Sequence, residues 1–142
     1  MDGVYLRFRG NSNSYSATVF AGKFELKAKS GKYIVTCRDK KVAAVVELSQ
    51  SGENEINFKS GDATLEFVFP VEGNWNVSLS RKIDNKSVHI ASLNTIDDTS
   101  SKITKLSAGD YSMYAYCRSK DFKTNITVKS TLKSGETKKI KF

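Results

Sequence analysis

Few residues in this chain could carry out chemistry, and they are not grouped as a catalytic site would require. His89 is the only histidine, and it lies in the alternating stretch 87–91, where Val88 and Ile90 take the opposite face. Sites built on a serine or cysteine nucleophile need such a base beside the nucleophile. We interpret His89 as a solvent-facing strand residue, so the sequence predicts that the protein is not an enzyme.

The residues that could hold a metal or a cofactor are also isolated from one another. Cys37 and Cys117 lie in different halves of the chain, and with a single histidine they cannot complete a structural zinc site. Asp97 and Asp98 are adjacent, whereas calcium ligands usually alternate along a loop. No glycine-rich phosphate-binding pattern occurs in the sequence. We therefore expect no metal, no cofactor and two buried free thiols.

Aromatic and basic side chains that alternate with apolar ones are the residues best suited to bind a partner. Tyr114, Tyr116 and Arg118 should point away from the core, as should Lys139 and Lys141 near the end of the sequence. Aromatic rings beside basic side chains can stack on bases or sugars. These five residues form the predicted partner-binding site. A solvated strand face, with lysines that discourage aggregation, explains the same pattern without any partner.

Charge and composition limit the class of protein. The chain has 142 residues and a net charge of +8, with 39% hydrophobic residues. Residues 1–60 contain 10 basic and 6 acidic residues, and residues 61–142 contain 13 and 9, so each half carries +4. Such an even excess favours a generally basic surface over a dedicated nucleic-acid arm. No apolar run approaches the roughly 18 residues of a membrane helix, and no secretory signal pattern opens the sequence, so we expect a cytoplasmic protein without a membrane partner.

Alternation with a period of two residues runs through most of the chain and predicts an all-β fold. Apolar residues occupy every second position in the stretches 4–8, 23–29, 33–37, 64–69, 75–79 and 111–117. This pattern is typical of strands with one face on a core and the other in solvent. The best helix candidate is 40–48, but its β-branched valines suit a strand equally well.

An internal repeat divides the chain into two similar halves. The first half contains, in order, Ser30-Gly31-Lys32-Tyr33, Cys37-Arg38, Ser51-Gly52-Glu53 and Ile56-Asn57-Phe58. The second half contains Ala108-Gly109-Asp110-Tyr111, Cys117-Arg118, Ser134-Gly135-Glu136 and Ile140-Lys141-Phe142. Because the order of these anchors matches, we predict two tandem small antiparallel β-sandwich domains, residues 1–60 and 61–142.

The two successive stretches Gly22-Lys23-Phe24-Glu25-Leu26 and Gly31-Lys32-Tyr33-Ile34-Val35 carry a resemblance to a known family. Their pattern resembles the core of transthyretin-like, or carboxypeptidase-regulatory-like, domains, which are Ig-like β-sandwiches. In the second half of the chain, Leu106, Gly109 and Tyr111 fit the second part of this pattern. Residues 101–104 stand where its first part would be and lack the glycine–aromatic pair. The resemblance implies a rigid spacer, stalk, accessory or virion-appendage domain and implies no activity.

Three functions are compatible with these observations. The preferred one is a non-enzymatic structural or interaction protein of a large assembly in a bacterial cytoplasm, specifically a bacteriophage virion component such as a capsid decoration, head or tail protein. Its partners would be other protein subunits, including an acidic capsid surface, and it would be oligomeric or assembly-bound. The alternatives are a carbohydrate-binding or adhesin module with Tyr114 and Tyr116 as the sugar platform, and a basic nucleic-acid-binding protein.

Overall fold

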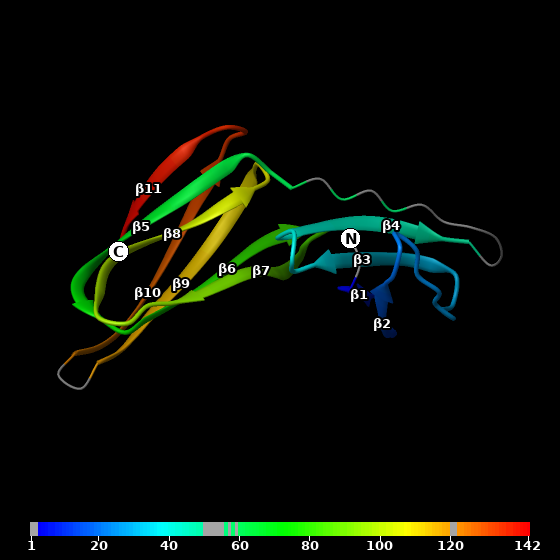
Figure 1. Cartoon of the computed structure of the whole chain (residues 1–142), viewed down its shortest axis with the longest axis horizontal. Coiled ribbons are helices and arrows are strands. Elements are labelled where there is room, and N and C mark those ends of the chain that lie inside the picture. The colour runs from blue at the N-terminus through cyan, green and yellow to red at the C-terminus, as the bar shows by residue number, and fades with distance from the viewer. Residues whose placement is uncertain (1–2, 50–55, 57, 59, 120–121) are drawn as a thin grey trace. The chain divides into compact units, whose positions relative to one another are not determined.

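The residues that the structure describes form eleven strands, and the chain separates into two compact units. The computed structural model describes residues 3–49, 56, 58, 60–119 and 122–142 (Figure 1). Within these residues there is no helix, so the predicted all-β class is confirmed. Contacts between Cα atoms divide the chain into unit 1, Met1–Lys59, and unit 2, Ser60–Phe142.

Unit 1 is organised around one four-stranded antiparallel sheet with the order β2-β1-β3-β4. Its strands are β1 (Val4–Arg9), β2 (Ser14–Val19), β3 (Gly31–Cys37) and β4 (Val42–Leu48). One face of the sheet is apolar because the sequence alternates, and it forms a core around Leu6, Phe8, Tyr33, Val35 and Cys37. The ambiguous stretch 40–48 is therefore mainly a strand, as its β-branched residues favour.

The prediction of a strand over 23–29 is wrong for the residues that the structure describes there. These residues form no ladder, and Lys23 makes only an isolated bridge with Phe20. The alternation is still visible in the burial, because Phe24 and Leu26 pack half-buried against the core while Glu25 is exposed. Alternation reports which face of an extended segment is covered, whereas a ladder also needs a neighbouring backbone.

The predicted closing segment of unit 1 lies partly outside the described residues. Ile56 and Phe58 pack against the core of unit 1, and neither is in a strand. Asn57 and the predicted turn 51–53 lie outside the described residues.

Unit 2 contains two sheets. The first has the order β10-β9-β6-β7 and the second the order β11-β5-β8. The strands are β5 (Ala63–Gly73), β6 (Trp75–Ile83), β7 (Lys86–Asn94), β8 (Asp98–Leu106), β9 (Gly109–Ser119), β10 (Phe122–Leu132) and β11 (Thr137–Lys141). All neighbours are antiparallel except β11, which runs parallel to β5.

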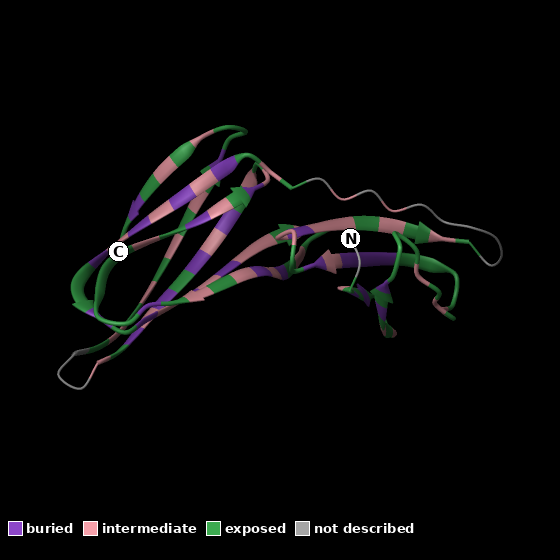
Figure 2. Cartoon of the chain, in the orientation of Figure 1, coloured by how far each residue is buried: buried purple, intermediate pink, exposed green. Residues whose placement is uncertain are grey.

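The two sheets of unit 2 bury alternate residues of their strands in a common core. Buried and less buried positions alternate along β5, β6 and β9 (Figure 2). Across the core, Phe69 of β5 stacks on Trp75 of β6 with ring centroids 4.9 Å apart, and Phe142 stacks on Phe69. Thr95 is the only buried polar residue among those described, and its Oγ1 accepts a hydrogen bond from the Trp75 backbone N–H at 3.0 Å.

The four-stranded sheets of the two units share one topology. The two sheets correspond strand by strand in chain order: β1 matches β6, β2 matches β7, β3 matches β9 and β4 matches β10. In each unit a tyrosine near the start of the third of these strands donates its hydroxyl to a carbonyl four residues upstream. Tyr33 bonds Lys29 O at 2.6 Å, and Tyr111 bonds Ser107 O at 2.7 Å. Such a tyrosine corner is a recurrent feature of Ig-like sandwiches.

Each tyrosine corner follows a glycine whose conformation other residues rarely adopt. Gly31 has φ of 146° and Gly109 has φ of 157°, each two residues before its tyrosine. At Gly109 a Cβ atom would lie 2.9 Å from the guanidinium of Arg81. Burial raises the pKa of the Tyr111 phenol, with Arg81 acting in the opposite direction. The repeated glycine–tyrosine spacing therefore has the same structural use in both units.

Removing either corner hydroxyl should destabilise the protein. In Tyr33→Phe and Tyr111→Phe, a carbonyl loses its donor, and we expect the free energy of unfolding to fall by about 1–2 kcal/mol. Urea unfolding of each variant measures the change. Tyr5→Phe is the matched control, because the Tyr5 hydroxyl bonds Ser16 Oγ at an exposed position. A loss in Tyr5→Phe as large as in the corner variants would contradict a special role for the corners.

Asp62 ties the start of unit 2 to the turn between β10 and β11. Its Oδ1 accepts hydrogen bonds from the Gly135 backbone N–H at 2.8 Å and from Ser134 Oγ at 3.1 Å. These bonds favour the carboxylate, the Gly135 bond most strongly, and they lower the pKa of Asp62 below its ordinary value of 3.8.

The stability contributed by the Asp62 carboxylate should depend on pH. Because the folded-state pKa is lowered, this contribution is present above the unfolded pKa of 3.8 and is lost as the pH falls through the folded pKa. Asp62→Asn should therefore weaken the acid dependence of unfolding in urea between about pH 5 and 2. Asp98→Asn makes the same charge change at an exposed strand position and is the control. Equal acid dependence in the two variants would contradict the assignment.

Candidate functional site

The outer face of β9 presents two tyrosines and an arginine in a row. Met113 and Ala115 point into the core and are fully buried, so the intervening side chains must point outward. The rings of Tyr114 and Tyr116 have centroids 6.2 Å apart and planes tilted by 35°. The Arg118 guanidinium lies over the Tyr116 ring at 4.8 Å, a cation–π contact. We call Tyr114, Tyr116, Arg118 and their cross-strand neighbours the tyrosine face.

Polar side chains flank the two tyrosines on both neighbouring strands. Asn76 of β6 and Asn125 of β10 lie opposite Tyr116, and Ser78 and Thr127 lie opposite Tyr114. The side-chain amide Nδ2 of Asn76 in turn donates a hydrogen bond to Asn94 Oδ1 on β7 at 2.5 Å. The three strands β10, β6 and β7 thus carry amide side chains in one row with Tyr116 of β9. A flat face with aromatic rings and hydrogen-bonding groups can bind a polar ligand or a protein surface.

One end of the tyrosine face is positively charged. Arg118 and Lys123 are directly opposed across β9 and β10. Like charges in this position repel each other, so an anionic group would be favoured beside them. A shallow hollow of about 520 Å³ lies here and is lined by Tyr116, Cys117, Arg118, Lys123, Thr124 and Asn125.

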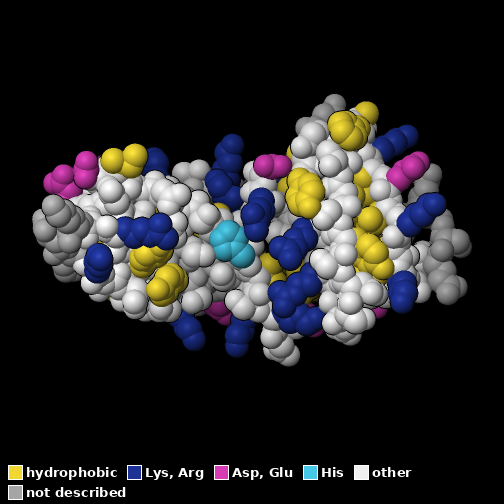
Figure 3. Space-filling view, turned by 90° about the horizontal axis from the view of Figure 1, so that it is seen from below, with side chains coloured by type: hydrophobic (Ala, Val, Ile, Leu, Met, Phe, Trp, Pro, Cys, Tyr) yellow, Lys and Arg dark blue, Asp and Glu magenta, His cyan; other side chains and the backbone are white. Residues whose placement is uncertain are grey.

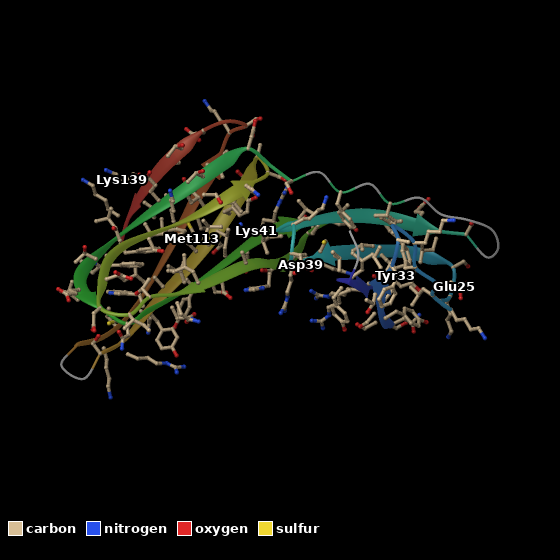
Figure 4. All side chains as sticks on the ribbon, viewed as in Figure 1. Glu25, Tyr33, Asp39, Lys41, Met113 and Lys139 are labelled. Atoms are coloured by element: carbon tan, nitrogen blue, oxygen red, sulfur yellow. The ribbon has the colours of Figure 1, made fainter. Side chains whose placement is uncertain are left out.

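The structure divides the five predicted partner-binding residues between two sheets. Tyr114, Tyr116 and Arg118 are together on β9, whereas Lys139 and Lys141 lie on β11 in the other sheet. Lys139 is on the outer side of β11, while Met113 lies inside the unit (Figure 4). In the register of the sheet, Lys139 is opposite Glu66 of β5. The two lysines therefore belong to a separate surface.

The residues considered for catalysis and metal binding are dispersed in the structure. His89 lies on β7, half-buried, on the opposite face from Val88 and Ile90. Cys37 and Cys117 are buried free thiols, as the sequence predicts. The part of the chain that the structure describes contains no group of three side chains that could hold a metal ion.

Of the acidic pair after β7, Asp97 lies in the bend between β7 and β8, and Asp98 is the first residue of β8. Asp97 has φ of 51°, and its backbone N–H donates to Asn74 Oδ1 at 3.0 Å. These contacts give Asp97 a local structural role.

The basic side chains are distributed over the surface. In Figure 3, Lys and Arg side chains occur at many places on the visible face, and several of them adjoin one another near its middle, beside the histidine. A concentrated basic stripe is the usual electrostatic footprint of a nucleic-acid-binding surface. The tyrosine face contributes two cations, Arg118 and Lys123, and several neutral polar groups.

Sequence reasoning missed the amide residues and Lys123 of the tyrosine face. Asn76, Asn94 and Asn125 are polar residues at outward positions of their own strands, which the alternation does indicate. Their meeting at Tyr116 depends on the register of three strand pairs, and a bulge between Leu79 and Ser80 shifts one of them. Register is set by turns and bulges rather than by alternation.

No protein-family model, curated protein or solved structure matches this chain. The resemblance to transthyretin-like domains therefore stays a prediction. Among the described residues, none belongs to a helix of the length and apolarity needed to cross a membrane.

Proposed function

We propose that the chain is a tandem of two small antiparallel β-sandwich domains and serves as a non-enzymatic structural or interaction subunit of a larger assembly. The shared topology of the two four-stranded sheets supports the tandem arrangement. The buried core of unit 2 between its two sheets and the half-buried second layer of unit 1 support the sandwich architecture.

The tyrosine face is the observation that carries this proposal. Tyrosine and arginine are enriched at the energetic centres of protein interfaces. Here Tyr114, Tyr116 and Arg118 are held on a rigid sheet, so that binding would order few side chains. Two opposed cations at one end, Arg118 and Lys123, favour an acidic partner surface. The narrower identification as a bacteriophage capsid decoration, head or tail protein stays a prediction from the sequence.

Photo-crosslinking in cells that make the protein natively tests this function. With p-benzoylphenylalanine in place of Tyr114, we expect a covalent adduct of one defined mass with a protein partner. The same substitution at Tyr5, which is exposed on unit 1, is the control and should give no such adduct. Adding Arg118→Glu should reduce the Tyr114 adduct several-fold, because it reverses a charge beside the contact. Equal crosslinking from both positions, or none from Tyr114, would overturn the proposal.

A carbohydrate-binding module is the second candidate, favoured by the amide row beside Tyr116. Asn76, Asn94 and Asn125 could hydrogen-bond sugar hydroxyls while the ring of Tyr116 stacks on a sugar face. A glycan array should then show binding that is insensitive to salt and lost in Tyr116→Ala, with Ser87→Ala as a surface control. An array without hits removes this candidate. DNA binding with steep salt dependence would instead point to the nucleic-acid function.

A further inference from the structure

One edge of the unit 1 sheet is a strand that is almost entirely apolar. β4 pairs antiparallel with β3 along its whole length, from Val42 opposite Cys37 to Leu48 opposite Gly31, without a register shift. The sheet order places β4 at an edge, and no strand among the described residues pairs with its other side. Every residue of β4 is apolar except Glu47. β4 is therefore a regular edge strand with one open side and a single charge.

The other edge strands in the described part of the chain are more polar than β4. β10, which matches β4 in unit 2, exposes Lys123 and Lys129. β7, β8 and β11 also carry lysines, and β2 presents serine and threonine side chains outward. Lysines on an edge oppose association, because like charges meet when two such edges approach. β4 has no lysine and exposes 40% of Val45 at the middle of its outer face.

The inner face of β4 is also incompletely covered. Val46 and Leu48 pack against the core of unit 1, but both are only partly buried. A strand paired with the open side of β4 would place its own inward side chains beside Val46 and Leu48. The apolar surface removed from water on this face would add to the main-chain hydrogen bonds of the new pair.

We propose that two copies of this chain associate by pairing their β4 strands. The two strands would run antiparallel about a two-fold axis at Val45, perpendicular to the sheet, so that the two unit 1 sheets continue as one sheet. Main-chain hydrogen bonds between edges supply the affinity in such a β-augmentation. This interface lies in unit 1, so the inference goes beyond the role proposed for the tyrosine face and does not depend on it.

The sequence of β4 is complementary to itself about this axis. This is the register in which every residue of β4 finds a partner, whereas a shift in either direction leaves residues at both ends unpaired. The opposed pairs would be Val45 with Val45, Ala44 with Val46, Ala43 with Glu47 and Val42 with Leu48.

Charge favours a second copy in this register. The two Glu47 side chains lie toward opposite ends of the pair, about 14 Å apart at the strand rise per residue. This separation exceeds the Debye length of about 8 Å at physiological ionic strength, so their repulsion is screened. No like charges are directly opposed within β4, and apolar side chains meet on both faces of the sheet.

Cysteine crosslinking of the purified full chain locates the interface. In Val45→Cys, the two new thiols would be directly opposed with Cβ atoms about 5 Å apart, close to disulfide distance. Mild oxidation should therefore convert most of the protein into a covalent dimer on a non-reducing gel. The natural Cys37 and Cys117 are buried and should not react. Thr127→Cys, at an exposed position of β10, is the matched control and should stay monomeric.

Charges placed on the two-fold axis test the pairing itself. Val45→Lys and Val45→Glu each oppose like charges, and sedimentation equilibrium should show the dimer Kd raised about 10-fold or more over the natural chain. An equimolar mixture of the two variants opposes unlike charges and should associate again. Mixing cannot repair a folding defect, so this recovery would come from the pairing at position 45.

The matched control for the charge variants is Thr127→Lys, which should leave the dimer Kd unchanged. The inference is overturned if the natural chain stays monomeric at its highest soluble concentration. It is also overturned if charges at position 45 leave the dimer intact, if Thr127→Lys weakens it equally, or if the mixture of the two Val45 variants fails to associate.

Discussion

Each four-stranded sheet in this protein has one apolar face, and that face must be covered by a second layer. The requirement follows from alternation, because every strand that places Phe8 or Met113 inward adds to one continuous apolar surface. Unit 2 meets it with a paired three-stranded sheet, in which Phe69 stacks on Trp75. Unit 1 meets it with extended segments whose side chains cover the core although their described backbone forms no sheet.

Covering the inner face leaves the outer face free to vary, and the outer face is where a binding surface can arise. On β9 the inward series of Met113, Ala115 and Cys117 maintains the core while Tyr114, Tyr116 and Arg118 face outward. The strand pairing then brings the asparagines of neighbouring strands beside Tyr116. The same sheet is therefore both the scaffold of unit 2 and the support of the tyrosine face.

Alternation allowed the sequence to predict the β class, most strands and the outward direction of the tyrosines. It could not predict the features that depend on pairing between distant segments. The stretch 23–29 alternates as a strand does, yet apart from the bridge between Lys23 and Phe20 it pairs with no described strand. Thr95 is buried because it bonds Trp75 and Gly73, some 20 residues away in the chain. Residue type alone groups Lys139 with Tyr116, although the two residues lie on different sheets.

An extended edge is ordinarily a hazard, since its unpaired backbone can join the edge of any other chain. In unit 1 the cost of leaving the edge open is small, because Phe8 and Val35 are already fully covered and the backbone groups outside the core can bond to water. Lys23, Lys27 and Lys29 are exposed along this edge and would repel an identical edge. Exposed lysines thus allow an extended segment to cover a core with its side chains while its backbone stays in solvent.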